Sequence, residues 1–265
     1  MKIASWNVNS LKVRLPQLLQ WMADTQPDIV ALQETKLEDA KFPVDELAAA
    51  GYRAVFAGQK TYNGVAILAR VPLTLSEVTT DIPDLDDPQR RILAATVGQP
   101  GDDPARALRV VNLYVVNGKA VGDPKYAYKL DWLAKVHAFL ALEHVRHPNL
   151  VVLGDFNIAP EDRDVHDPLG WGESVLCSPP ERAALGAITG LGLHDSFRLF
   201  EQEAGHHSWW DYRQGAFRRN LGLRIDLILL GDALKATARA AAIDRTPRRW
   251  ERPSDHTPVT LDLDI

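Results

Sequence analysis

The chain has 265 residues, 46% of them hydrophobic and 25% charged, and its net charge at pH 7 is −5. These values are typical of a globular protein with a sizeable core, and no apolar run approaches the length of a membrane span, so we expect no membrane partner. The single cysteine, Cys177, excludes an intrachain disulfide and fits a reducing compartment.

Strand-like and helical patterns alternate along the chain. The N-terminal segment MKIASWNVNS is strand-like and lacks an apolar signal-peptide core, so we expect a soluble, cytoplasmic protein. The runs of strand length are Lys2–Trp6, Ile29–Leu32, Ala54–Ala57, Val65–Ala69, Ile92–Val97, Ala107–Val115, Leu150–Leu153, Ile225–Leu230 and Thr257–Leu263. Helical spacing predicts helices over Leu15–Asp24, Lys125–His144 and Pro180–Gly190. On the second of these helices we expect Lys125, Lys129 and Asp131 to face solvent. No repeat or Gly/Ser linker interrupts them, so we expect one mixed α/β domain over residues 1–265.

Polar side chains stand where several of these apolar runs stop. They are Asn7, Glu34, Asp155, Asn157, Asp226, Asp255 and His256. Strand ends are where α/β proteins build sites, because the sheet is rigid and the adjoining loop is exposed. Carboxylates, amides and a histidine can together hold a hard cation and move a proton. The set predicts metal-assisted hydrolysis of a phosphate ester, and the lack of a P-loop or GxGxxG motif argues against a nucleotide cofactor.

Some of these positions also have an interpretation without chemistry. Asp155 and Asn157 share one face if their strand continues, but they could instead form an Asx turn. Asp226 lies inside the apolar strand RIDLILL, where a carboxylate needs a partner. His256 is one candidate partner, Arg224 or another arginine is the other, and the sequence does not decide between them.

Eight segments, in this order, closely resemble the exonuclease III and AP (apurinic/apyrimidinic) endonuclease family. They are KIASWNVNSLKVRLPQLLQW, PDIVALQETKL, NGVAILAR, VNLYVVNG, VVLGDFNIAPEDRDV, SWWDYR, GLRIDLILL and PSDHTPV. GDFN and SDH mark only the wider superfamily of endonucleases, exonucleases and phosphatases, whereas SWWDYR and GLRID narrow the resemblance to DNA repair. The resemblance implies a four-layer α/β sandwich, in which two packed mixed β-sheets are flanked by helices, and dependence on Mg²⁺ or Mn²⁺.

The resemblance also implies roles for individual residues. The residues implied around the metal are Asn7, Glu34, Asp155, Asn157, Asp255 and His256, with Glu34 as the principal ligand. The residues implied in catalysis are Tyr114, Asp155, Asn157, Asp226 and His256. Among them, Asp155 resembles the acid that activates or orients the attacking water, and Asn157 resembles the amide that steadies the phosphate. Asp226 and His256 resemble a hydrogen-bonded pair at the scissile phosphate, and Tyr114 resembles a phenol at the phosphate or the leaving oxygen.

The residues implied in DNA binding form a second group. They are Arg90, Arg91, Trp209, Arg218, Leu223 and Ile225. Trp209, Leu223 and Ile225 resemble a wall that receives a baseless deoxyribose flipped out of the helix and excludes a bulkier nucleotide. Trp209 and Trp210 could instead be core residues. Two arginine-rich segments could grip phosphates or simply be solvated: Arg213, Arg218, Arg219 and Arg224, then Arg245, Arg248, Arg249 and Arg252.

Two residues depart from the pattern of the family. Asn9 stands where some members carry an aspartate, which leaves one fewer negative charge beside the metal. Val116 replaces a proline that is common after the position of Tyr114, so this loop is less constrained. Neither change removes a catalytic group.

The sequence therefore predicts a monomeric, metal-dependent DNA phosphodiesterase of base-excision repair. It is expected to cut duplex DNA 5′ to an abasic site and also to process 3′ ends. Two alternatives remain open. One is a phosphodiesterase of the same superfamily that acts on lipid or inositol headgroups, which the SWWDYR segment and the arginines disfavour. The other is a non-catalytic module that binds damaged DNA, which would have no use for the carboxylates at Glu34, Asp155, Asp226 and Asp255.

Overall fold

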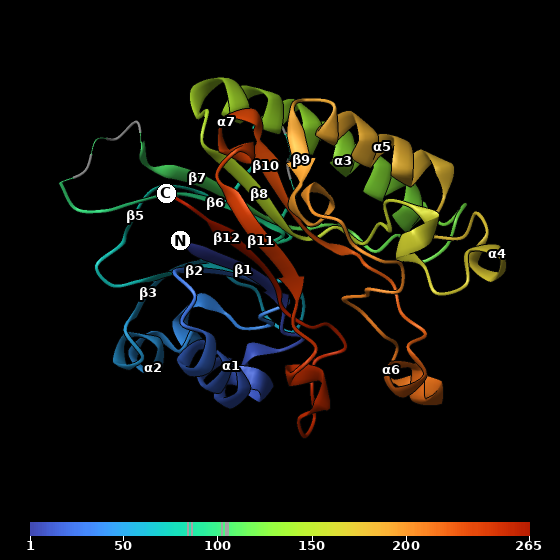
Figure 1. Ribbon diagram of the computed structural model, residues 1–265, viewed down its shortest axis with the longest axis horizontal. Coiled ribbons are helices and arrows are strands. Elements are labelled where there is room, and N and C mark those ends of the chain that lie inside the picture. The colour runs from blue at the N-terminus through green and yellow to red at the C-terminus, as the bar shows by residue number, and fades with distance from the viewer. Residues whose placement is uncertain (84, 86, 102, 104–105) are drawn as a thin grey trace.

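The computed structural model describes residues 1–265 except 84, 86, 102, 104 and 105. In this part of the chain, two six-stranded sheets pack face to face and helices cover their outer faces (Figure 1). The helices are α1 (Leu11–Thr25), α2 (Val44–Ala49), α3 (Pro124–Arg146), α4 (Pro168–Trp171), α5 (Pro179–Thr189), α6 (Ala216–Arg219) and α7 (Asp232–Lys235). Figure 1 shows α1 and α2 outside one sheet and α3 and α5 outside the other. The predicted four-layer sandwich is confirmed.

Both sheets are mixed. In the first sheet the order is β11 (Ala238–Ile243), β12 (Val259–Leu263), β1 (Lys2–Asn7), β2 (Ile29–Gln33), β4 (Val65–Arg70) and β3 (Tyr52–Ala57). In the second it is β5 (Thr74–Thr79), β6 (Ile92–Gly98), β7 (Leu108–Tyr114), β8 (Leu150–Asp155), β10 (Asp226–Gly231) and β9 (Leu193–Asp195). The pairs β1–β2 and β7–β8 are parallel, so the carboxyl ends of four strands meet at one edge of the sandwich.

Three strands have no counterpart among the predicted ones: β5, β9 and β11. All three lie at sheet edges, where a strand has one neighbour and buries little side-chain surface. The sequence of β5 is TLSEVT and that of β11 is ARAAAI, and β9 has only three residues. None of them is a run of bulky apolar residues such as those of the predicted strands.

Polar side chains join the two sheets inside the otherwise apolar core. The Gln33 amide donates to Asn112 Oδ1 at 2.8 Å, and the Asn112 amide donates to the carbonyls of Leu32 and Ala66, each at 2.9 Å. Gln33 also donates to Ser5 Oγ at 3.1 Å. Gln33 and Asn112 are both fully buried. Asn112 of β7 thus forms directional hydrogen bonds to β2 and β4 of the other sheet, close to the strand ends that carry the polar residues.

No helix among the described residues is both long enough and apolar enough to cross a membrane.

Candidate active site

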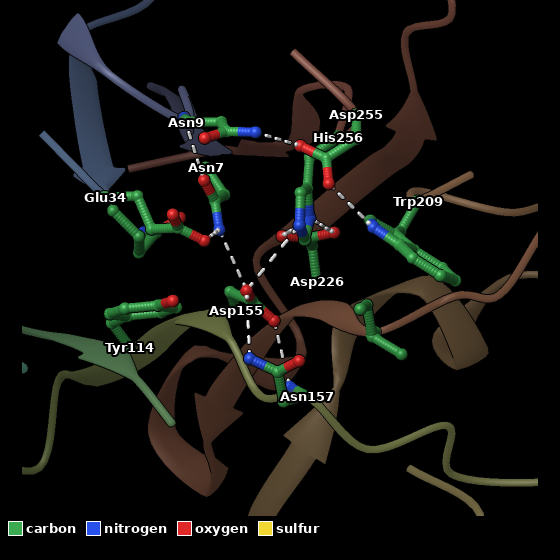
Figure 2. Close-up of polar contacts among 12 residues, drawn as sticks. Asn7, Asn9, Glu34, Tyr114, Asp155, Asn157, Trp209, Asp226, Asp255 and His256 are labelled. Carbon is green, nitrogen blue, oxygen red and sulfur yellow. Dashed lines mark hydrogen bonds and ion pairs between the residues drawn. The ribbon is translucent and has the colours of Figure 1, made fainter. Parts of the chain in front are cut away.

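One edge of the sandwich collects the polar residues singled out from the sequence. Asn7 is the last residue of β1, Asp155 is the last residue of β8, and Glu34 directly follows β2. Asp226 begins β10 directly opposite Asp155 in the antiparallel register. His256 precedes β12, which runs antiparallel to β1 and therefore starts where β1 ends. Figure 2 shows these side chains pointing toward one another from both sheets.

Asn7 connects the two sheets at the centre of the site. Its amide nitrogen donates to Glu34 Oε1 and to Asp155 Oδ2, each at 2.9 Å. Asn7 is fully buried, and its side-chain oxygen, Oδ1, accepts a hydrogen bond from the backbone N–H of Asn9 at 3.0 Å. Both hydrogens and the oxygen of the amide are thus used, which fixes its orientation. Asn7 therefore holds a carboxylate from each sheet at a set distance (Figure 2).

Glu34 lies beside a cation of the chain itself. Lys36 Nζ is 2.8 Å from Glu34 Oε2 and also donates to Asn9 Oδ1 at 2.5 Å. Burial raises the pKa of Glu34, but the Lys36 charge and the hydrogen bond from Asn7 outweigh burial, so the pKa lies below its ordinary value. Glu34 is therefore an anion at neutral pH.

His256 is held between two aspartates. Its Nδ1 lies 2.9 and 3.1 Å from the two oxygens of Asp226, and its Nε2 lies 3.7 Å from Asp155 Oδ2. Burial lowers the pKa of His256, but the charges of Asp226 and Asp155 outweigh burial and raise the pKa well above its ordinary value. Burial raises the pKa of Asp155, and the charge of Asp226 adds to this rise while His256 opposes it. Of the two partners suggested by the sequence for Asp226, the structure gives it His256.

A group of possible metal ligands lies at the same place. Ligand atoms of Glu34, Asp155 and His256 all lie within 4.8 Å of one another. Carboxylate oxygens are the ligands preferred by hard cations such as Mg²⁺. Glu34 and Asp155, one from each sheet and both held by Asn7, could therefore bind such an ion together.

Asp255 faces this group but is engaged elsewhere. Its Oδ1 accepts the amide of Asn9 at 2.9 Å, and its Oδ2 accepts the indole N–H of Trp209 at 3.0 Å (Figure 2). Burial raises the pKa of Asp255, but His256 and these hydrogen bonds bring it below its ordinary value. Asp255 is an oriented anion, and it joins Trp209 to the cluster of charged residues.

Tyr114 and Asn157 complete the site on the side of the second sheet. Burial raises the pKa of Tyr114 well above its ordinary value, and the nearby charge of Glu34 adds to this, so the phenol keeps its proton. The amide nitrogen of Asn157 donates to the Val115 carbonyl at 3.0 Å and to Asp155 Oδ2 at 3.2 Å. The backbone N–H of Asn157 donates to Asp155 Oδ1 at 2.9 Å. This Asx turn does not exclude a role at the site, because it places Asn157 against Asp155.

An apolar wall adjoins the charged residues. Leu223 and Ile225 are buried together with Leu176, and the partly buried Trp209 packs against them. Trp210, in contrast, is fully buried, and its indole donates to Asn220 Oδ1 at 3.2 Å. Trp210 is therefore the core residue of the pair, and Trp209 lies at the wall.

The arginine-rich segments are not uniform surface patches. Arg224 is 1% exposed and forms ion pairs of 2.7 Å with Asp164 and with Asp195. Arg248 is also buried and donates to the Trp210 carbonyl at 3.1 Å. The suggestion that these two arginines face solvent or DNA is wrong, because their guanidinium groups satisfy buried acceptors in the fold.

The arginines singled out for DNA binding lie in three different settings. Arg90 is partly exposed and pairs with Asp81 at 3.0 Å. The Arg91 guanidinium stacks over the Tyr114 ring, 4.7 Å from its centroid, and donates to the Tyr114 carbonyl at 3.3 Å. Arg218 lies on α6, which projects from the body of the molecule (Figure 1).

Comparison with known proteins decides the family. The model of the endonuclease/exonuclease/phosphatase family matches residues 4–256. The chain belongs to this family. It is 34% identical to exodeoxyribonuclease III of Haemophilus influenzae, with 98% of each chain covered. Two structures of NExo from Neisseria, described as a 3′-5′ exonuclease and as a 3′ phosphatase bound to a product DNA hairpin, are 48% and 47% identical to it, and each matches with a TM-score of 0.94 over the whole of both chains. An AP endonuclease from Archaeoglobus fulgidus is 34% identical, with a TM-score of 0.91 over the whole of both chains.

The resemblance to exonuclease III is thus confirmed, and the chain is a hydrolase of this endonuclease/exonuclease/phosphatase family, in which metal dependence is typical. Two residues near the site were missed by sequence reasoning. Lys36 contacts Glu34, and Asn117 donates to Asn157 Oδ1 at 3.1 Å. Lys36 stands two residues after Glu34 in the segment QETK, but both residues have a left-handed backbone conformation with φ 53°, so the alternation of an extended strand does not predict their contact.

Two substitutions of Trp209 test the expectation that it belongs to a wall that receives a deoxyribose, because its indole N–H also donates a hydrogen bond to Asp255. Trp209→Ala should remove the apolar wall and leave an oxygen of Asp255 without its donor, whereas Trp209→Phe should remove only the donor. We expect Trp209→Ala to lower the ratio of abasic to intact-duplex cleavage, and Trp209→Phe to keep that ratio while shifting the Mg²⁺ concentration required. Cleavage of both duplexes is measured across a Mg²⁺ titration. An unchanged ratio in a folded Trp209→Ala protein would mean that Trp209 serves only packing.

Proposed function

We propose that the chain hydrolyses the phosphodiester 5′ to abasic sites in duplex DNA, with Mg²⁺ or Mn²⁺ as its cofactor. The observation that carries this proposal is the position of the Trp209 wall. Trp209 donates a hydrogen bond to Asp255, which interacts with His256 of the largely buried group of Glu34, Asp155 and His256. A headgroup phosphodiesterase would need similar charges but no wall shaped for a flipped deoxyribose. A binding module would need neither the carboxylates nor the Asp226–His256 pair.

The donor set fits a hard divalent cation. Glu34 and Asp155 would hold the ion, with Asn7 keeping the two carboxylates at their distance. When bound, such an ion offsets the charge of the phosphate and stabilises the leaving alkoxide. Asp255, the further ligand implied by the resemblance, accepts one hydrogen bond on each oxygen, from Asn9 and from Trp209, and each oxygen keeps a lone pair for the ion.

The residues of the chain supply positioning and proton transfer. Asp155 accepts a proton from the attacking water, a role suited to a carboxyl whose pKa burial has raised. His256, held by Asp226, contacts the scissile phosphate, and the Asn157 amide steadies that phosphate. Tyr114 keeps its proton and donates it as a hydrogen bond to a phosphate or leaving oxygen. Direct attack by water requires no covalent intermediate.

A second activity, removal of groups from 3′ ends, is favoured by a specific observation. The NExo structures, described by 3′-5′ exonuclease and 3′ phosphatase activities, are 47–48% identical to the chain, compared with 34% for the AP endonuclease. We therefore infer that the same residues also hydrolyse 3′-terminal phosphate esters in DNA.

One assay tests both activities. Two labelled duplexes are needed, one with a single internal abasic analogue and one with a 3′-phosphate, each with Mg²⁺ and with EDTA. We expect Mg²⁺-dependent cleavage of both, and binding of the abasic duplex that survives EDTA. Binding without cleavage would indicate a recognition module. Inactivity on both duplexes together with hydrolysis of an inositol phosphate would support the headgroup alternative.

Salt dependence tests the contact with the DNA backbone. Affinity should fall with salt with a log–log slope of about −0.9 for each phosphate neutralised. Arg218→Ala and Arg90→Ala should each make that slope smaller by roughly one unit. Arg239→Ala is the matched control, because Arg239 pairs with Asp264 at the end of β12 opposite His256. A slope that is the same in all four proteins would place the DNA elsewhere.

We also propose that residues 1–265 form one catalytic domain that works as a monomer. Support comes from the origin of the site residues, which both sheets of a single chain supply.

A further inference from the structure

An ion pair lies beneath the site in the outer layer of helices. It joins Lys129 of α3 to Glu181 of α5, and both side chains are 0% exposed. Taking two charges out of water costs free energy that an apolar pair would not cost, so a buried ion pair is weak grounds for stability by itself. The contacts that each partner makes indicate what the pair does.

All three hydrogens of the Lys129 ammonium are engaged in hydrogen bonds. Besides Glu181, it donates to the Asn157 carbonyl at 2.7 Å and to the Asn117 carbonyl at 3.2 Å. An ammonium has three donors, so none is left over. Asn117 in turn donates to Asn157 Oδ1 at 3.1 Å. Lys129 thus holds the backbone of Asn157 and also the residue that holds its side chain.

The carboxylate of Glu181 holds the other side of the site. Its Oε1 accepts the backbone N–H of Leu176 at 3.0 Å, and its Oε2 accepts the backbone N–H of Ser178 at 3.1 Å and Ser178 Oγ at 2.5 Å. Leu176 is buried with Leu223 and Ile225 in the apolar wall. Glu181 therefore fixes one residue of the wall through its backbone.

Asn157 and Leu176, whose backbones are hydrogen-bonded to the ion pair, both have an unfavourable backbone conformation. Asn157 has φ 49° and Leu176 has φ 76°, both in the left-handed region. For leucine in particular this region is costly, and such conformations persist only where the surroundings hold them. Hydrogen bonds to a buried ion pair are surroundings of this kind.

We propose that Lys129 and Glu181 are positioning residues, and that their ion pair fixes the Asn157 amide relative to the Leu176 part of the wall. This rests on the proposed function, in which Asn157 steadies the phosphate and the wall receives the deoxyribose. Both side chains are fully buried, so the pair offers no surface to a substrate. It acts by keeping two loops, one after β8 and one before α5, in register with each other.

A second buried ion pair offers a matched control. Arg109 and Glu143, with side chains 4% and 6% exposed, pair at 2.5 Å. Arg109 also donates to the Glu77 carbonyl at 2.6 Å, on the edge strand β5. This pair involves α3 as well, but it holds a sheet edge and no residue of the site.

The test replaces each pair by apolar residues of similar length, as Lys129→Met with Glu181→Leu and as Arg109→Met with Glu143→Leu. Such replacements often leave a protein folded. We expect the first double variant to lose about 100-fold in kcat with little change in KM, the order of loss caused by a misplaced site residue. The control should keep its kcat. Wild-type kcat in the folded first variant would overturn the proposal.

A neutral pair separates positioning from stability. Lys129→Gln with Glu181→Gln keeps hydrogen-bond donors for the Asn157 carbonyl, so it should recover part of the kcat that the Met/Leu pair loses. Losses that follow only the unfolding temperature, in all three double variants, would identify the pair as a plain stabiliser and overturn the proposal.

Hydrogen exchange supplies a readout that does not depend on the reaction. Protection of backbone amides at residues 156–159 and 174–178 should fall in the Met/Leu variant while the strands keep theirs. Unchanged protection in both segments would contradict the proposal. If the wild-type protein cleaves no DNA, the proposed function fails, but lost protection would still show that the pair holds the loops.

Discussion

Glu34→Gln should abolish most activity at low Mg²⁺ while the protein stays folded. A neutral amide is a poor ligand for a hard cation, and the substitution also removes the negative charge that pairs with Lys36. The loss should exceed the roughly 10–100-fold fall in metal affinity that follows loss of a residue supporting a ligand. Raising Mg²⁺ or Mn²⁺ should restore part of the rate. The measurement is cleavage rate against metal concentration for both proteins.

The control for Glu34→Gln removes an acid outside the site. Glu38 lies four residues further along, pairs with Lys41 and is partly exposed, so Glu38→Gln should have the wild-type metal dependence. Wild-type rates from Glu34→Gln at low metal would show that the cation does not use this carboxylate. A loss that excess metal leaves untouched would point instead to the orientation of Asn7.

Replacing the groups around the phosphate should reduce turnover far more than DNA affinity. We expect Asp155→Asn to lower kcat by about 10²–10⁴-fold, the usual contribution of a positioned proton acceptor. His256→Asn should also act mainly on kcat, because the proposed function places the imidazole at the reacting phosphate and not at the flanking DNA. The measurements are single-turnover rates and DNA affinity in EDTA. A fall in affinity that accounts for the whole loss would move these residues from catalysis to binding.

Asp226 should affect the reaction partly through His256. Its two oxygens lie 2.9 and 3.1 Å from His256 Nδ1, so Asp226→Asn should disturb both the orientation and the charge of the imidazole. The Asp226→Asn and His256→Asn double variant should then be less impaired than the product of the single effects. Strict additivity of the two free-energy changes would mean that the pair does not act as a unit.

The sequence was informative about the site because the site lies at strand ends. Asn7, Glu34 and Asp155 each follow an apolar run, and parallel pairing of β1 with β2 brings two of those ends together. The Asp226–His256 contact was one of two open possibilities, because the choice depends on where Arg224 finds its acceptors. Arg224 forms ion pairs with Asp164 and Asp195, and no spacing in the sequence predicts that these residues meet.

Two other contacts between residues far apart in the chain could not be predicted from the sequence either. Lys129 was interpreted as a residue on the wet face of its helix, and this was wrong: the side chain is fully buried against Glu181. A lysine at a helical position ordinarily faces solvent, and only the three-dimensional placement of α5 provides the carboxylate that compensates its burial. The hydrogen bond from Trp209 to Asp255 depends in the same way on two loops that meet only in the fold.

The amides of Gln33 and Asn112 inside the core have a mechanical consequence for the reaction. Contacts between apolar side chains are non-directional, so they fix the offset of two packed sheets less strictly than hydrogen bonds do. Directional bonds from Asn112 to the Leu32 and Ala66 carbonyls resist shear between the sheets. Asn7 and Glu34 belong to one sheet, whereas Asp155 and Asp226 belong to the other, so any shear would pull the site apart along its middle. The relative positions of the site residues therefore depend on hydrogen bonds that join the two sheets inside the core.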